Sequence, residues 1–167
     1  MEQKEVRALL EQVSSGELDI DEAMLKLKEA PFEDLGFAKL DYHRALRQGI
    51  GEVIYGAGKT PEQIHDIVAS MVQQGQKSIL ITRMSSEAAE AVEQDFLIKY
   101  DKYSRIGLVG EIPEPDGIGK VVVAAAGTSD LPVAEEAAQT AECFGNEVIR
   151  LYDVGVAGLH RLLAHRE

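Results

Sequence analysis

The segment from Val121 to Pro132 constrains the fold more than any other part of this chain. It reads Val-Val-Val-Ala-Ala-Ala-Gly-Thr-Ser-Asp-Leu-Pro. Six apolar residues without polar alternation predict a strand buried on both faces, as in a parallel sheet. Gly127 ends this strand, and Pro132 fits the first turn of a following helix. The segment therefore predicts a strand–turn–helix unit of an α/β fold, with its turn at the carboxyl edge of the sheet.

The turn itself, Thr128-Ser129-Asp130, offers two hydroxyls and a carboxylate where the helix begins. Free backbone N–H groups at a helix N-terminus bind phosphate and other anions. The same three residues are also favourable helix caps, with no ligand involved. From these residues alone, an anion site and a simple cap are equally consistent with the pattern.

The rest of the chain predicts helices followed by two α/β blocks. Residues 1–36 form the first predicted domain, a helical hairpin ended by Pro31. Residues 37–112 form a small α/β domain with a βαβαβ unit, and residues 117–167 form a Rossmann-like parallel αβα block of three layers. The linker 111–119 carries two prolines and two glycines, which are typical of a boundary.

The expected elements follow from apolar periodicity and turn residues. Strands are expected at 53–55, 78–82, 106–109, 120–126 and 147–152, and helices at 61–74, 85–95, 130–144 and 157–165. The last block then has only two strands, so a strand edge is left unpaired and the helices are only partly packed against the sheet.

Composition limits the classes of partner. The 167 residues include 17 basic and 29 acidic side chains, a net charge of −12, which opposes binding to nucleic acid or an anionic membrane. The single cysteine, Cys143, excludes an intramolecular disulfide and a cysteine-based zinc site. No apolar run approaches about 20 residues, and the charged amino terminus does not fit a signal peptide. We expect a cytoplasmic protein without a metal centre.

Three cations ahead of and after the first strand are candidates for an anion site. Lys59 lies in Gly58-Lys59-Thr60, which lacks the earlier glycine of a phosphate-binding P-loop. Lys59 is either an exposed lysine beside the helix cap Thr60 or a phosphate ligand at that helix end. Arg44 and Arg47, three residues apart, either clamp an anion or lie on a solvated helix face beside Asp41 and His43.

His160 and Cys143 are the remaining candidates for a catalytic role, as a proton-transfer group and a thiol nucleophile. A lone histidine near a helix start is usually a surface residue, although its pKa near 6.5 suits proton transfer. Cys143 falls late in a predicted helix, among Ala141, Glu142 and Phe144, which favours a buried or half-buried structural thiol.

The order of these motifs resembles a known family. The turn at Gly127, Ser129, Asp130 and Pro132 is similar to the Gly-Ser-x-Ser-Asp-x-Pro turn of aminoimidazole ribonucleotide carboxylases, although one residue shorter. Small residues leading into His160-Arg161 resemble that family's second motif. With Asp41–Gly49 and Glu52–Thr60, the chain resembles the pyridinium-3,5-biscarboxylic acid mononucleotide synthases of nickel-pincer cofactor biosynthesis, encoded in lactate racemization operons.

This resemblance implies a carboxylase and hydrolase acting on nicotinic acid adenine dinucleotide. CO2 or bicarbonate would be the co-substrate, no tightly bound cofactor is implied, and Mg²⁺ is a candidate ion. His160 would handle protons and CO2, while Gly127, Thr128, Ser129, Asp130, Arg44, Lys59 and Arg161 would bind substrate and phosphate. The family's cysteine nucleophile has no match here, so we expect the chain to lack the carboxyl-terminal part and to be inactive alone. Related families assemble as octamers, which implies a homo-oligomer.

Two other functions stay open. A purine-pathway carboxylase or mutase acting on aminoimidazole ribonucleotide shares the turn and the histidine, but that family begins almost directly at the phosphate strand. A noncatalytic nucleotide-binding or assembly module needs only the turn.

Overall fold

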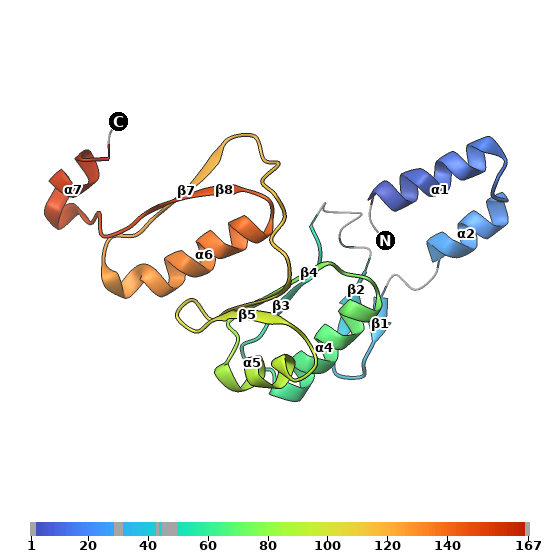
Figure 1. The fold of residues 1–167 in the computed structure, drawn as a ribbon, viewed down its shortest axis with the longest axis horizontal. Helices are drawn as coiled ribbons and strands as arrows, with labels where there is room; N and C mark the ends of the chain where they lie inside the picture. The colour runs from blue at the N-terminus through green and yellow to red at the C-terminus, as the bar shows by residue number, and fades with distance from the viewer. Residues whose placement is uncertain (1–2, 29–31, 43, 45–49, 166–167) are drawn as a thin grey trace. The chain divides into compact units, whose positions relative to one another are not determined.

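The computed structural model describes residues 3–28, 32–42, 44 and 50–165. The chain forms two compact units, Met1–Glu52 and Val53–Glu167 (Figure 1). Helices combine with one parallel, one antiparallel and one mixed sheet, which confirms the predicted α/β class. The predicted limits of the domains stay predictions.

The first unit begins with the expected helical hairpin. Helix α1 spans Gln3–Ser15 and α2 spans Ile20–Lys28. The Asp19 carboxylate accepts a hydrogen bond from the Asp21 N–H at 2.8 Å, which fixes the start of α2. A short antiparallel hairpin, β1 (Phe32–Asp34) and β2 (Lys39–Asp41), follows and was not predicted.

The second unit contains a four-stranded sheet in the order β3-β4-β6-β5. Its elements are β3 (Val53–Tyr55), α4 (Pro61–Gln73), β4 (Ser78–Thr82), α5 (Ser86–Glu93), β5 (Ile98–Asp101) and β6 (Ile106–Gly110). The core consists of buried aliphatic side chains from α4, β4 and α5, among them Ile64, Ile67, Met71, Ile79, Ile81 and Val92. Thr60 and Gln63 form the capping box of α4 that the sequence predicts.

This sheet is mixed, so the predicted simple βαβαβ unit is wrong in one respect. Strands β3 and β4 are parallel, but the unpredicted β5 forms a hairpin with β6, and β6 therefore runs antiparallel to β4. The Asp101 carboxylate shapes the hairpin turn by accepting hydrogen bonds from the Tyr103 N–H and the Ser104 hydroxyl, each at 2.9 Å. Arg105 completes the reversal with φ +59°.

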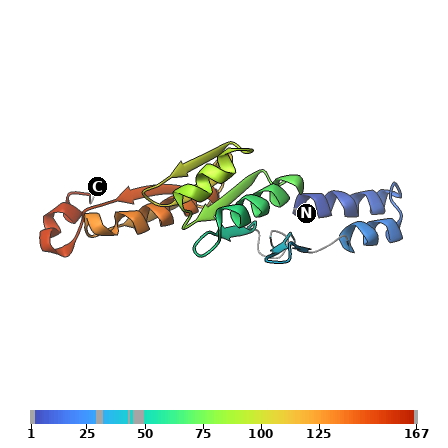
Figure 2. The same ribbon diagram turned by 90° about the horizontal axis from the view of Figure 1, so that it is seen from below.

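A separate two-stranded parallel sheet follows residues 111–119, which contain no helix or strand. It pairs β7 (Lys120–Ala124) with β8 (Glu147–Leu151), and α6 (Leu131–Cys143) connects them. Figures 1 and 2 show α6 running alongside both strands. Arg150 of β8 bonds Glu135 and Glu142 of α6, so the sheet face that carries Arg150 is the one that α6 covers.

The prediction that the apolar strand is buried on both faces is wrong. Val122 is 56% exposed, and its partner Ile149 on β8 is 43% exposed. Both lie on the face opposite Arg150, because successive side chains of a strand alternate between faces. The apolar run suits a strand with two covering layers, and within the described residues only one is present.

After β8 comes a 3₁₀ turn, η2 (Val156–Gly158). Helix α7 (Leu159–Leu163) follows and lies within the predicted helix 157–165. Leu159 and Leu163 of α7 are each more than half exposed. No helix among the described residues is long and apolar enough to cross a membrane.

Candidate functional site

The turn after β7 is a 3₁₀ helix, η1 (Thr128–Asp130), that leads directly into α6. Pro132 lies in the first turn of α6, as expected. The Asp130 N–H donates to the Gly127 carbonyl at 3.0 Å, and the Gly127 N–H donates to the Asp130 carboxylate at 3.2 Å. The Thr128 and Ser129 side chains are exposed. The turn is thus closed by its own groups, and its two hydroxyls face solvent.

The Asp130 side chain does not cap α6, because its oxygen accepts from Gly127 within the turn instead. Gly127 has φ −140° and ψ 170°, an extended conformation that any residue adopts. A Cβ atom at Gly127 would meet nothing within 4 Å. The strand therefore ends here because the backbone turns into η1, and a glycine is not required for that.

The turn after β8 lies directly beside the turn after β7. The Val154 N–H donates to the Ala125 carbonyl at 3.1 Å, and the Gly155 N–H donates to the Ala126 carbonyl at 3.0 Å. A Cβ on Gly155 would lie 2.8 Å from the Ala126 oxygen, so the close approach requires a glycine. These bonds bring the Gly127–Asp130 turn next to the segment that leads to His160 and Arg161.

Within that second segment, Arg161 is held in place by an acidic partner. The Arg161 guanidinium forms an ion pair with Asp153 and lies against Gly158, where a Cβ would come within 2.7 Å of its Nε. His160 is exposed at the start of α7. The imidazole is therefore accessible to a ligand.

Four of the eight predicted site residues, Gly127, Thr128, Ser129 and Asp130, form the first turn. Two more, His160 and Arg161, lie on α7, which follows the second turn. Lys59 lies at the end of the other parallel pair, where its ammonium donates to the Tyr55 carbonyl at 2.7 Å. Arg44 belongs to the first compact unit and contacts Glu52 at 3.3 Å. Of the remaining candidates, Asp41 ends β2, and His43 and Arg47 lie outside the described residues. The functional roles of all these residues stay predictions.

Cys143 ends α6, at the opposite end of the helix from the turn. Burial, with a smaller contribution from the neighbouring Glu142 carboxylate, raises the pKa of its thiol to about 11. At pH 7 only about one thiol in ten thousand is then ionised. A thiol attacks as thiolate, so the raised pKa favours a packing role for Cys143 over that of an activated nucleophile.

Sequence reasoning missed the side chains that attach α6 to the four-stranded sheet. Arg83, which follows β4 with φ +53°, pairs with Glu136 of α6 at 2.7 Å. Gln139 of α6 donates to Asp101 of β5 at 2.7 Å. Only the position of Arg83 directly after a buried strand could have marked it, since its acidic partner is 53 residues away.

No group of three or more His, Cys, Asp or Glu side chains that could hold a metal ion occurs among the described residues.

The fold and this edge define an α/β protein in which two strand–helix turns meet at one end of a parallel strand pair. Residues 32–111 match the family model of the LarB/PurE-like N-terminal domain, which covers β1 to the end of β6. This match supports a place for the chain in the LarB/PurE-like superfamily.

A relative from Methanocaldococcus jannaschii, the uncharacterized protein MJ0165, is 36% identical over 166 residues. The alignment covers 95% of this chain and 65% of the relative, so the chain spans a little less than two thirds of that protein's length. The similarity thus extends beyond residues 32–111 into the part that contains both turns.

Proposed function

We propose that the chain is the nucleotide-binding part of a carboxylase that acts on the pyridinium ring of nicotinic acid adenine dinucleotide. The LarB/PurE-like domain suggests a carboxylase- or mutase-like family member. The full reaction would carboxylate the ring and hydrolyse the phosphoanhydride, giving pyridinium-3,5-biscarboxylic acid mononucleotide and AMP. The observation that carries the proposal is the backbone pairing of Ala125 and Ala126 with Val154 and Gly155, which joins the two turns.

The first turn offers groups suited to a phosphate. The exposed Thr128 and Ser129 hydroxyls precede α6, a helix of 13 residues whose N-terminus carries partial positive charge. The Asp130 carboxylate would repel a phosphate, so we assign it to ribose hydroxyl groups. Arg161, held by Asp153, would supply a cation at the same edge.

Further positive charge would come from Arg44 and Lys59. A protein with net charge −12 needs local cations to bind a dinucleotide that carries two phosphates and a carboxylate. Each well-formed charge-assisted contact is worth roughly 1.5–3 kcal/mol. Any Mg²⁺ would be held chiefly by the substrate's phosphate oxygens, since Mg²⁺ commonly binds through them.

His160 would handle the proton of the carboxylation. In the proposed chemistry a thiolate adds to the electron-poor ring, and a neighbouring ring carbon becomes nucleophilic and attacks CO2. The proton on that carbon then passes to His160, and expulsion of the thiolate restores the aromatic ring. An exposed imidazole on the helix that follows the second turn is suited to accept that proton.

Cys143, with its raised pKa, is not the thiolate of this scheme. Because the chain has one cysteine, the nucleophile would be supplied from outside these 167 residues. The chain alone is therefore expected to bind the dinucleotide without turning it over.

Binding is tested by calorimetric titration with nicotinic acid adenine dinucleotide. The double variant Ser129→Ala/Asp130→Ala is expected to lose at least about tenfold in affinity, which is about 1.4 kcal/mol, with little change in melting temperature. The control Ser14→Ala/Asp21→Ala removes the same groups from exposed positions of α1 and α2. Equal affinity in all three proteins would leave the turn with a structural role only. Tighter binding of aminoimidazole ribonucleotide would favour the purine-pathway alternative.

Turnover is tested with labelled bicarbonate and the dinucleotide. We expect no labelled product from the chain alone. Bicarbonate-dependent turnover that survives Cys143→Ser would show that no second thiol is needed. Turnover that a folded Cys143→Ser variant abolishes would identify Cys143 as the nucleophile and contradict its assignment to packing.

A further inference from the structure

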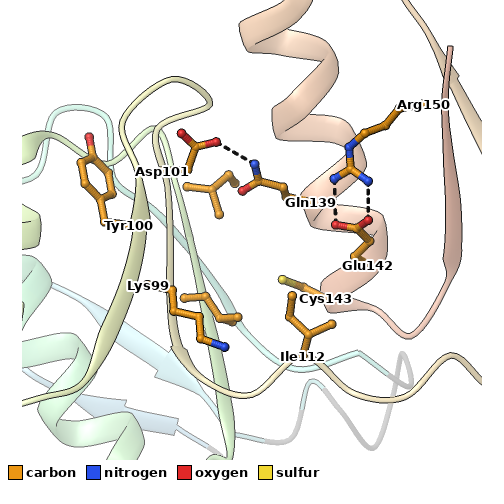
Figure 3. Close-up of a pocket in the computed structure, with 10 residues that line it drawn as sticks. Lys99, Tyr100, Asp101, Ile112, Gln139, Glu142, Cys143 and Arg150 are labelled. Atoms are coloured by element: carbon orange, nitrogen blue, oxygen red, sulfur yellow. Dashed lines mark hydrogen bonds and ion pairs between the residues drawn. The ribbon is translucent and has the colours of Figure 1, made fainter. Parts of the chain in front are cut away.

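A cavity in the Val53–Glu167 unit lies between the β5–β6 hairpin and the carboxyl-terminal half of α6 (Figure 3). Its volume is about 360 Å³. Ile106 and Leu108 of β6 are buried residues that line it, and Cys143 of α6 lies on the opposite wall. One side of the cavity is thus apolar and belongs to the protein core.

The cavity is distinct from the site proposed above. The phosphate turn precedes the first residue of α6, whereas Cys143 is its last residue. Thirteen residues of helix separate the two points, a distance of about 20 Å. One nucleotide phosphate cannot occupy both places.

The acidic groups around the cavity are already bonded to the protein. Burial opposes ionisation of Asp101, but hydrogen bonds from Gln139, Tyr103 and Ser104 outweigh it and hold the pKa of the carboxyl below its usual value. Glu142 receives two hydrogen bonds from Arg150 (Figure 3). Arg150 also bonds Glu135. These groups are fixed by internal partners and require no ligand.

Lys99 differs from them. It lies on β5, lines the cavity, and forms no hydrogen bond or ion pair within the described residues. Figure 3 shows its side chain extending from the strand toward the side where Ile112 lies. An unpaired ammonium at the edge of an apolar cavity is complementary to an anionic group on an apolar body.

We propose that this cavity binds a small aromatic monocarboxylic acid, with its carboxylate at Lys99 and its ring against Ile106, Leu108 and Cys143. The volume lies at the lower end of the range for ligand sites, which fits one ring rather than a dinucleotide. A phosphate dianion is disfavoured, because the Asp101 and Glu142 carboxylates share the cavity with a single unpaired cation.

Cys143 provides a direct reporter of occupancy, because it is the only cysteine in the chain. Benzoate is the probe, and benzamide, a neutral molecule of the same shape, is its control. The rate of Cys143 alkylation by iodoacetamide is measured at constant pH and ionic strength against increasing concentrations of each. We expect benzoate to slow alkylation to a saturating limit, and benzamide to need about tenfold higher concentrations or more.

Two variants test the role of the ammonium. Lys99→Gln, at an exposed strand position, should remove the advantage of benzoate over benzamide, whereas Lys102→Gln, in the adjacent turn and outside the cavity, should retain it. Circular dichroism melting checks that both variants fold. No protection by benzoate at millimolar concentrations would overturn the proposal, as would protection that Lys99→Gln leaves unchanged. Neither result bears on dinucleotide binding at the other end of α6.

Discussion

At the scale of single residues, the environments of Asp130 and Cys143, at the two ends of α6, determine what each side chain can do. Asp130 is exposed, but its carboxylate closes the turn by accepting the Gly127 N–H. Cys143 is half-buried, and burial keeps its thiol protonated at neutral pH. Asp130 is therefore accessible to a ligand, whereas the protonated thiol of Cys143 is a weak nucleophile at neutral pH.

The raised pKa of Cys143 predicts an unusual pH profile of alkylation. Its rate should increase about tenfold per pH unit up to pH 10, because the thiolate fraction rises in this way below the pKa of about 11. The urea-unfolded chain is the control and should level off near pH 9. By linkage, the folded chain gains stability from this group below pH 9 and loses that contribution as the pH rises toward 11. A native profile that levels off at pH 8–9 would contradict the assignment.

At the scale of elements, the site depends on the contact between two turns rather than on either turn alone. Gly155 permits the contact, because any Cβ there would press on the Ala126 carbonyl. Gly127 has open space around it and an unstrained backbone. The contact between the two turns therefore requires a glycine at position 155 but not at position 127.

We predict that Gly155→Ala destabilises the chain by about 1–3 kcal/mol, as overpacking against backbone does, and weakens dinucleotide binding. Gly127→Ala, the matched control, should change the free energy of unfolding by less than about 0.5 kcal/mol. Urea denaturation and calorimetric titration measure both effects. Equal behaviour of the two variants would show that the close approach of the turns is not important.

The sequence predicted local elements well and non-local arrangements less well. The Thr60 cap, the strand at 53–55 and the helix after Pro132 depend on neighbouring residues, and the structure has all three. The β5–β6 hairpin was missed because Ile98–Asp101 has only 4 residues, which is too short for its alternation of apolar and polar side chains to mark a strand. The exposure of Val122 depends on how many layers cover the strand, and the ion pair of Arg83 with Glu136 joins residues far apart in sequence. Neither the exposure of Val122 nor this ion pair can be predicted from the pattern of neighbouring residues.

At the scale of the whole molecule, the β7–β8 sheet presents one apolar face without cover in the described part of the chain. This face carries Val122 and Ile149, and α7 exposes Leu159 and Leu163 nearby in sequence. Parallel sheets are normally covered on both faces. Exposed apolar patches of this kind bind hydrophobic dyes.

We therefore expect the folded chain to bind the dye ANS, and the variant Val122→Lys/Ile149→Lys to bind it less. Both side chains are exposed, so each change should alter stability by no more than about 0.5 kcal/mol. The control Leu97→Lys changes a residue that is 88% exposed and lies outside this sheet, and it should leave the fluorescence unaltered. Undiminished fluorescence in the double variant would place the dye elsewhere.

The claim that the two turns form a nucleotide site is tested most directly by NMR. Backbone amide shifts of the ¹⁵N-labelled chain are followed during titration with nicotinic acid adenine dinucleotide. The account predicts saturable shifts concentrated at residues 127–131 and 153–161, with the same titration curve at both segments. Shifts confined to other parts of the chain, or no saturable shifts at all, would contradict it.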